Sequence, residues 1–206
     1  MNTLSPIHVS AVLFEGFELL DFFGPLEMFG LLEDAAKITV VAEKIGAVKS
    51  SSGPRGMPDA TMAGSGRFDL LLVPGGIGTR KEMANPQFLA ELKRLAEASQ
   101  IVATVCTGSF LLARTGLLDG RKATSNKRVF QQVKTYAPKV EWIAKARWVE
   151  DGKFFTSSGV SAGMDMALAV IAKMCGRETS LQIACRAEYV WHEDSSWDPF
   201  AAVAGL

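Results

Sequence analysis

The stretch from Ile101 to Leu112 constrains the fold more than any other part of the chain. Its first half, Ile-Val-Ala-Thr-Val, is short, apolar and rich in β-branched residues, which is typical of a strand buried on both faces. Its second half continues to Arg114 with helical spacing, and Cys106 separates the two halves. The sequence therefore predicts a tight strand-to-helix turn, at which the first helical N–H groups have no partner within the helix.

Cys106 is a candidate reactive residue because of this position. Amides at a helix start favour an anion, so we expect them to lower the pKa of the thiol and to stabilise an oxyanion on a bound substrate. The alternative is a small buried hydrophobe, the usual role of an isolated cysteine on an apolar strand. A second buried strand, Phe68 to Pro74, leads into a Gly-Gly turn. Parallel strands would bring the amides of Gly76 and Thr107 close to the one sulfur.

Length and charge limit the possible functions. With 206 residues, 48% of them hydrophobic, the chain is expected to form a single α/β domain over residues 1–206. Its formal charge is zero, so no attraction to nucleic acid or to an anionic membrane is expected. No export signal and no stretch of ~18 apolar residues is found, which predicts a cytoplasmic protein without a membrane span. We expect Arg55, Lys81 and Lys127 to be ordinary solvated residues.

Cysteine and histidine spacing predicts no metal site. The three cysteines, Cys106, Cys175 and Cys185, lack metal-type spacing, and an odd number argues against a disulfide framework. Cys175 and Cys185 fall in apolar, helical sequence. His8 and His192 are the two histidines, and neither has the neighbours of a metal ligand.

Strand and helix patterns alternate along the rest of the chain. Strands are expected at residues 7–14, 37–44, 140–149 and 153–157 with a short one toward 124, and helices at 86–98, 129–136, 164–174 and 178–190. Residues 50–62 are rich in Ser, Gly and Pro, as in a surface excursion or a short hairpin, and Asp151-Gly152 predicts a hairpin. The C-terminal tail, with its aromatic and acidic residues, is expected to pack against the body. The alternation predicts a doubly wound, mainly parallel sheet with helices on both faces.

Asp21 is a second candidate residue, in the link between the first strand and the next helix. Helical spacing begins around Leu19, but Pro25 suits a first helical turn, which places Asp21 just before the helix. Capping that helix is the common role for such an aspartate. However, Asp21, Gly76 and Cys106 all follow expected strands, and sites in such folds lie at that edge of the sheet. We therefore favour an active-site acid, whose pKa is raised by apolar neighbours.

Several segments resemble the ThiJ/PfpI superfamily, a class I glutamine amidotransferase-like group. They are Leu20-Asp-Phe-Phe-Gly-Pro, Val73-Pro-Gly-Gly, Val105-Cys-Thr-Gly-Ser, Gly116-Leu-Leu-Asp-Gly-Arg-Lys-Ala-Thr and Ser158-Gly-Val-Ser-Ala-Gly-Met-Asp. Within the superfamily, the chain is most similar to the isonitrile (isocyanide) hydratase branch. The resemblance implies a flavodoxin-like fold, a homodimer, no cofactor and a small electrophilic substrate.

The resemblance also implies a role for each candidate. By position, Cys106 is the nucleophile and Asp21 its acid–base partner, although Glu18 or Glu15 could take that place. The amides of Gly76 and Thr107 would face developing negative charge. These residues correspond to the family's catalytic cysteine, its aspartate and its oxyanion-binding loops.

One segment departs from the pattern. The hydratase branch usually has Thr-His-Trp after the Arg-Lys-Ala-Thr turn, whereas this chain has Ser125, Asn126 and Lys127. A Cys-His dyad cannot be built unless the tail folds over the site. That weakens a peptidase interpretation, because amide cleavage needs a general acid for the leaving amine. It also leaves the substrate of a hydratase open.

Three functions remain after this comparison. The first is hydration of an isocyanide to an N-substituted formamide through a thioimidate on Cys106, with Asp21 as the acid and base. The second is a glyoxalase-like reaction on a 2-oxoaldehyde, although those relatives generally add a histidine. The third is a non-enzymatic redox sensor based on an oxidisable thiol. Some relatives carry a DNA-binding helix-turn-helix after this domain; none follows Phe200 here, so direct DNA binding is not expected.

Overall fold

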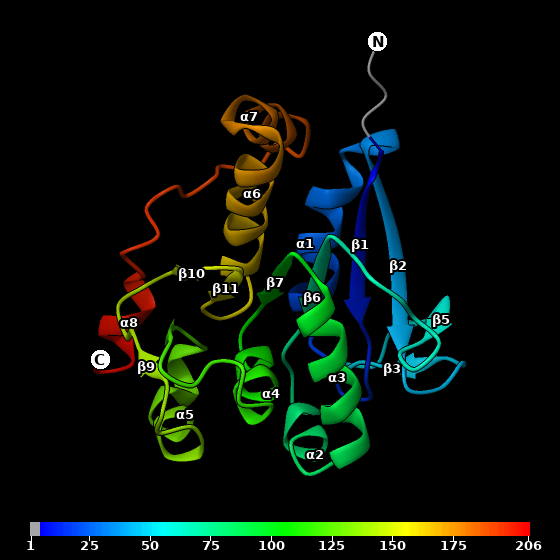
Figure 1. Ribbon diagram of the computed structural model, residues 1–206. Helices are drawn as coiled ribbons and strands as arrows, with labels where there is room; N and C mark the ends of the chain where they lie inside the picture. Colours follow the sequence, from blue (N-terminus) through cyan, green and yellow to red (C-terminus); the bar gives the residue numbers. More distant parts are fainter. Residues whose placement is uncertain (1–4) are drawn as a thin grey trace.

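A seven-stranded sheet forms the centre of the molecule in the computed structural model, which describes residues 5–206 (Figure 1). Its strand order is β10-β11-β7-β6-β1-β2-β5. Every neighbouring pair is parallel except β10 and β11, which form the predicted hairpin. The strands are β1 Ile7–Val12, β2 Ala36–Ala42, β5 Ala60–Thr61, β6 Leu70–Val73, β7 Ile101–Thr104, β10 Trp148–Asp151 and β11 Phe154–Ser157.

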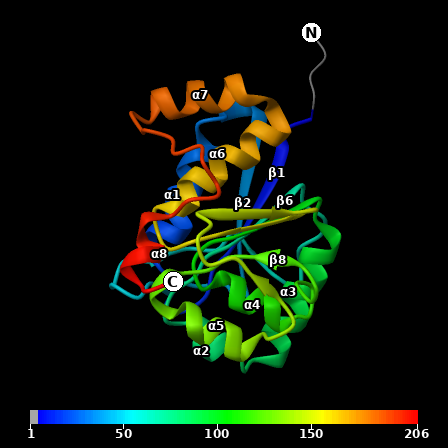
Figure 2. The same ribbon diagram turned by 90° about the vertical axis from the view of Figure 1, so that its left-hand side faces the viewer.

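Helices cover both faces of this sheet. Figure 2 shows α1, α6 and α7 on one side and α2, α3, α4 and α5 on the other. The helices are α1 Leu19–Gly30, α2 Thr79–Glu82, α3 Pro86–Ala98, α4 Gly108–Arg114, α5 Phe130–Tyr136, α6 Ala162–Cys175, α7 Arg177–Arg186 and α8 Pro199–Val203, with 3-10 turns η1 Glu33–Ala35 and η2 Lys127–Val129. This arrangement confirms the predicted flavodoxin-like, doubly wound fold.

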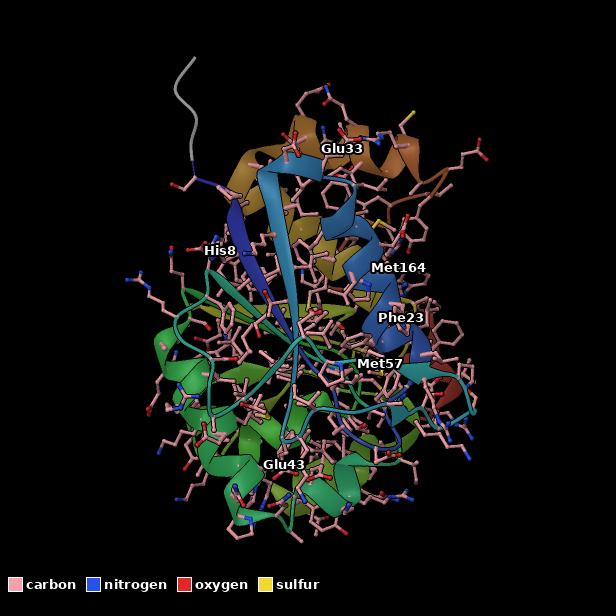
Figure 3. All side chains as sticks on the ribbon, turned by 90° about the vertical axis from the view of Figure 1, so that its right-hand side faces the viewer. His8, Phe23, Glu33, Glu43, Met57 and Met164 are labelled. Atoms are coloured by element: carbon pink, nitrogen blue, oxygen red, sulfur yellow. The ribbon has the colours of Figure 1, made fainter. Side chains whose placement is uncertain are left out.

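The central strands carry the core. All four residues of β6 and of β7 are buried, as expected for strands with helices on both faces. On one face, α1 packs along α6, and Figure 3 shows Phe23 and Met164 on these two neighbouring helices. A Cβ at Gly24 would lie only 3.0 Å from Met164 Cγ, so the glycine allows the close approach.

Two small sheets lie outside the central one. β3 Val48–Lys49 pairs antiparallel with β4 Arg55–Gly56, so a short hairpin begins just before the segment 50–62 for which a surface excursion or hairpin was predicted. β8 Lys122–Ala123 pairs in parallel with β9 Glu141–Trp142. None of the helices in residues 5–206 combines the length and hydrophobicity needed to cross a bilayer.

The start of α1 differs from the prediction. The helix begins at Leu19, after an extended Glu18, so that Asp21 lies in the first turn and not before it. Pro25 is inside the helix. Because proline has no N–H, the carbonyl of Asp21 loses its usual partner four residues on. Helical spacing in the sequence does begin at Leu19, so only the placement of Asp21 before the helix, which was inferred from Pro25, is wrong.

Two further boundaries differ. The single strand predicted for residues 140–149 is divided into β9 and β10, because the chain between them turns to bury Arg147 against Asp165. Helix α7 ends at Arg186 and not at Val190. Glu188 takes a left-handed conformation with φ 48°, and the amide of Tyr189 donates to the carbonyl of Ala184, which closes the helix.

The C-terminal tail packs against the body, as predicted. Arg147 and Asp165 form a buried ion pair of 2.6 Å. The same carboxylate accepts hydrogen bonds from the Tyr189 hydroxyl and the His192 amide, each at 2.9 Å. Trp191 Nε1 donates to the carbonyl of Asp165 at 3.1 Å. From this anchor the tail continues to α8, beside α5 and β9 (Figure 1).

Candidate active site

Cys106 occupies a sharp turn between β7 and α4. Its φ is 57°, a left-handed conformation that is uncommon for a residue with a side chain and marks a constrained turn. The amide of Cys106 donates to the carbonyls of Ser157 at 3.2 Å and Ser158 at 3.1 Å. Its carbonyl accepts from the hydroxyls of Ser109 at 3.0 Å and Ser125 at 2.9 Å. Both sides of the peptide are therefore fixed, which holds the sulfur in one direction.

The sulfur faces a cavity of about 380 Å³. Cys106 is 6% exposed, so it is buried but reachable from this space. The cavity is lined by Glu18, Gly76, Ile77, Thr79, Arg80, Cys106, Thr107, Phe110, Asn126, Arg128, Val129, Gln132 and Val160. Its walls come from the segments after β1, β6, β7 and β11 of the central sheet, which agrees with the predicted edge, and from the segment after β8.

The pKa of the Cys106 thiol is raised, and the predicted lowering is wrong. Burial is the main cause and raises the pKa to about 12, with a further contribution from the charge of Asp21. Hydrogen bonds from Asn126 and from the amide of Thr107 act in the opposite direction. Burial destabilises the thiolate by more than the hydrogen bonds from these two donors stabilise it.

Asp21 lies beside Cys106 and is fully buried. Its Oδ2 accepts a hydrogen bond from the amide of Gly75 at 3.0 Å. Its Oδ1 has no hydrogen-bond partner among residues 5–206, which leaves that oxygen to carry a proton. Burial raises the pKa of Asp21 to about 7, although the interactions with Cys106 and Gly75 lower it. The sequence-based expectation of a raised aspartate pKa is therefore confirmed.

The two side chains titrate as a pair. Once the first proton has left near pH 7, the carboxylate and the thiolate compete for the one that remains. A thiol beside a carboxylate and a thiolate beside a carboxylic acid carry the same net charge. The pair can therefore present a nucleophilic sulfur and a proton donor at the same time.

The Gly-Gly turn after β6 fits closely against this pair. A Cβ at Gly75 would lie 2.6 Å from the amide nitrogen of Thr107 and 2.8 Å from Asp21 Oδ2, so only glycine allows the three loops to meet. Asp21, Cys106 and Thr107 thus lie together, and the amide of Thr107 hydrogen-bonds the sulfur as the sequence predicted. The amide of Gly76 lies in the neighbouring loop but donates to the Thr107 hydroxyl, at 3.0 Å, and not to the sulfur. Glu18, the alternative partner, instead accepts a hydrogen bond from the Ser51 hydroxyl at 2.9 Å and lines the cavity.

Asn126 contacts the sulfur where the family pattern has a histidine. Its Nδ2 lies 3.1 Å from Cys106 Sγ, and its Oδ1 accepts from the amide of Arg128 at 2.9 Å. A Cβ at Gly159 would lie 2.6 Å from the same Nδ2, so the amide is closely packed. Its position after the Arg-Lys-Ala-Thr turn was the signal in the sequence, but its contact with the sulfur could not be inferred there. The cavity wall, within residues 5–206, includes neither histidine.

Lys127 is buried, so the prediction that it is an ordinary solvated residue is wrong. Its Nζ donates to the hydroxyl of Thr124 at 2.8 Å and to the carbonyl of Ala146 at 2.6 Å. Burial lowers the pKa of Lys127 to about 8, partly offset by the charge of Asp198. Arg55 and Lys81 are exposed, as expected. Lys127 therefore supports the loop behind Asn126.

A second cavity of about 220 Å³ adjoins the first and shares three of its residues, Asn126, Arg128 and Val160. Its other walls include Ser161 and Phe200, so the tail reaches this end of the site. Val160 has φ 47°, which is strained for a β-branched residue. The boundary between the two cavities is thus a constrained loop.

Comparison with known proteins identifies relatives with the same architecture. An isonitrile hydratase from Pseudomonas putida is 31% identical over 183 residues, which cover 89% of this chain and 78% of the relative. The dj-1beta protein of Drosophila melanogaster is 28% identical over 178 residues, 84% of this chain and 92% of that protein. A crystal structure of a ThiJ/PfpI family protein from Pseudomonas syringae superposes with a TM-score of 0.84 and 29% identity over 92% of this chain and 78% of that one.

The family assignment follows from these similarities and from the site. The DJ-1/PfpI family matches residues 8–173, which include all of β1 except Ile7, the Asp21 turn, the Gly-Gly loop and the Cys106 turn. With this match over most of the chain, and with a seven-stranded sheet of the same kind, the protein belongs to the DJ-1/PfpI family.

Proposed function

We propose that this protein hydrates an isocyanide to an N-substituted formamide, with Cys106 as the nucleophile and Asp21 as the acid and base. The observation that carries the proposal is the buried Cys106–Asp21 pair, which shares a proton near neutral pH at the wall of a cavity. The similarity to an isonitrile hydratase supports the same chemistry. No cofactor is needed for this reaction, because the pair supplies both the nucleophile and the proton.

The first step joins the substrate to the enzyme. The thiolate of Cys106 attacks the terminal carbon of R–N≡C, and Asp21 gives its proton to the same carbon. This forms a C–S bond and a C–H bond and leaves R–N=CH–S–Cys106, a thioimidate, beside an ionised Asp21. A buried acid with a raised pKa is suited to this transfer, because it is a strong enough acid for the new carbanion and still protonated near pH 7.

The second step releases the product. Asp21, now ionised, takes a proton from water as the water oxygen bonds to the thioimidate carbon. The nitrogen accepts a proton, the C–S bond breaks, and R–NH–CHO leaves with the sulfur electrons returned to Cys106. Of the two water protons, one ends on the nitrogen and the other restores Asp21. The Thr107 amide and the Asn126 amide both contact the sulfur and stabilise it as it becomes a thiolate again.

Asn126 fits this reaction better than it fits peptide cleavage. Hydrolysis of an amide needs an acid that protonates a departing amine, and an asparagine side chain cannot titrate. Isocyanide hydration has no leaving amine. Asn126 can still donate to the sulfur throughout the cycle, because its Nδ2 is already placed at 3.1 Å. The same absence of a titrating group at this position argues against a glyoxalase-like reaction.

The test is turnover of cyclohexyl isocyanide, followed as N-cyclohexylformamide by chromatography and mass spectrometry. We expect formamide from the wild type, loss of turnover in Cys106→Ala and a strong decrease in Asp21→Asn. Cys185→Ser is the matched control, because Cys185 is an exposed free thiol outside the cavity. Equal rates in the wild type and Cys106→Ala would end the proposal. Turnover of methylglyoxal in place of the isocyanide would favour the glyoxalase-like reaction.

We also propose that the chain forms a homodimer through the exposed side of α1. Leu20 and Phe23 on α1 and Met57 beside β4 are large apolar residues with substantial exposure. Figure 3 shows Phe23 and Met57 on one face of the molecule. Apolar side chains grouped in this way are typical of a surface that another molecule covers. A second copy would shield this face next to the first turn of α1, where Asp21 lies.

A further inference from the structure

Two arginines lie in the wall of the Cys106 cavity without a partner. Arg80 comes from α2 and Arg128 from η2, so they approach the cavity from different loops. Both are exposed, and neither guanidinium forms a hydrogen bond or an ion pair with another of the residues 5–206. Five other arginines do form ion pairs in the same part of the chain. The cavity therefore contains two unused cations on a protein whose formal charge is zero.

Arg128 is placed through the residue that touches the sulfur. Its amide donates to Asn126 Oδ1 at 2.9 Å, and Asn126 Nδ2 lies 3.1 Å from Cys106 Sγ. One side chain therefore links the backbone of Arg128 to the nucleophile. The guanidinium extends from this fixed point toward solvent, at the boundary that the two cavities share.

Arg80 is placed in a similar way from the opposite loop. Its neighbour Thr79 donates from its hydroxyl to the carbonyl of Gly76 at 2.8 Å and lies 3.3 Å from the hydroxyl of Thr107. The start of α2 is therefore held to the two loops next to the sulfur. Both positive charges therefore line the cavity through which a substrate would reach Cys106.

Based on the proposed function, we propose that the preferred substrates are isocyanides whose N-substituent ends in a carboxylate. The terminal isocyanide carbon would meet the sulfur, and a short apolar spacer would pass Ile77 and Val160. The carboxylate would then reach Arg128 and Arg80, whose planar guanidinium groups suit carboxylate oxygens. The product would be an N-formyl amino acid.

Glu18 carries a charge opposite to that of the two arginines. It lines the cavity as well, and its carboxylate is held by the Ser51 hydroxyl at 2.9 Å. A negative charge at this place weakens the attraction of an anion. Glu18→Gln should therefore lower the KM for an anionic isocyanide by a few-fold and leave a neutral one much less affected.

The kinetic test compares isocyanoacetate with ethyl isocyanoacetate, which has the same skeleton without the charge. We expect kcat/KM for the acid to exceed that for the ester by about tenfold or more at low ionic strength, and Arg128→Gln to remove most of that ratio. Arg80→Gln should reduce it by a smaller factor. Arg114→Gln is the control, because Arg114 is exposed on α4 outside this cavity, and it should keep the wild-type ratio. An ester preferred over the acid, or a ratio that both cavity variants retain, would overturn the inference.

A binding experiment separates this inference from the proposed reaction. N-formylglycinate and its ethyl ester are titrated calorimetrically into the wild type and Arg128→Gln. We expect the anion to bind more tightly than the ester, and this difference to disappear in the variant. If this holds but no isocyanide is hydrated, the anion site stands and the hydratase proposal fails. If isocyanides are hydrated but the wild type binds N-formylglycinate no more tightly than its ethyl ester, the anion site is wrong.

Discussion

Burial raises the pKa of Cys106, whereas hydrogen bonds to its sulfur lower it, and burial has the larger effect. The Thr107 amide and the Asn126 side chain favour a thiolate, as a helix start is expected to do. Burial and the neighbouring Asp21 favour the thiol, and together they raise the pKa of Cys106 to about 12. In the proposed mechanism, the thiolate therefore forms by exchange of a proton with Asp21 and not by simple ionisation to solvent.

Asp21 should make the stability of the protein depend on pH. Its pKa is about 7 in the folded protein and near 3.8 in an exposed chain, so between these values the folded state holds a proton that the unfolded state has lost. The free energy of unfolding should then decrease as pH rises from about 4 to about 7. Asp21→Asn removes this dependence. We expect the variant to gain on the order of 4 kcal/mol relative to the wild type across that range, measured by urea denaturation.

Glu27→Gln is the control for this prediction. Glu27 is exposed on the same helix, so its replacement should change the pH dependence far less. A constant difference in unfolding free energy between the wild type and Asp21→Asn at every pH would show that Asp21 is not held protonated by burial.

Asn126 should influence the sulfur directly. Asn126→Ala removes the 3.1 Å contact, and loss of a hydrogen bond to a charged group should lower kcat/KM by about 10- to 100-fold. The rate of Cys106 alkylation by iodoacetamide should fall at a given pH, since the pKa of the thiol rises. Asn126→Asp keeps the shape but presents oxygen to the sulfur, so it should be slower still. An aspartate variant as reactive as the wild type would mean that this contact has no role.

At the residue scale, sequence reasoning placed the residues of the candidate site near one another but did not predict their environment. The positions of Asp21, Gly76, Cys106 and Thr107 followed from strand ends at one edge of a parallel sheet. The sign of the Cys106 pKa shift did not follow, because it depends on how many atoms surround the sulfur. The burial of Lys127 was hidden for a similar reason: its partners, Thr124 and the carbonyl of Ala146, belong to loops whose approach is set by the tertiary fold.

At the scale of secondary-structure elements, the region between β9 and β10 shows how tertiary contacts override local pattern. Residues 140–149 have the apolar content of one strand, but the chain leaves the sheet so that Arg147 can meet Asp165 on α6. The carbonyl of Arg147 also accepts from the amide of Ser158, next to the second cavity. This single residue therefore connects a helix, the tail and the edge of the site.

Breaking the buried ion pair between Arg147 and Asp165 should strongly lower the free energy of unfolding. Arg147→Ala leaves the Asp165 carboxylate without its cation in a place where its side chain is 0% exposed. We expect a loss of about 3–5 kcal/mol in the free energy of unfolding, measured by chemical denaturation. Arg186→Ala removes an exposed pair with Glu33 and should cost much less. Equal losses for the two variants would show that the Arg147 contact is no more important than a surface pair.

At the scale of the whole molecule, the fold was predictable because the same pattern, an apolar strand followed by a helix, recurs along the chain. Each recurrence independently indicates a doubly wound parallel sheet, so an error at one boundary does not change the predicted topology. Helix ends were less certain, since the early end of α7 depends on a single left-handed residue, Glu188. The tail could be expected to pack because of its aromatic residues, but its attachment to Asp165 required the structure.

The proposed homodimer predicts a change in assembly on mutation of the exposed face of α1. Phe23 is 46% exposed, and Phe23→Glu should place a charge in the contact and convert the dimer to a monomer in sedimentation experiments. Ile45→Glu is the matched control, because Ile45 is a similarly exposed apolar residue that lines a cavity elsewhere. A Phe23→Glu protein that sediments like the wild type would place any dimer contact on another surface.

The pH dependence of kcat/KM for cyclohexyl isocyanide is the most direct test of whether the Cys106–Asp21 pair reacts with one proton between its two groups. We expect kcat/KM to rise about tenfold per pH unit below pH 7, to level above it as the first proton leaves the pair, and to lose this inflection in Asp21→Asn. A wild-type profile without an inflection near pH 7, or the same inflection in Asp21→Asn, would contradict this expectation.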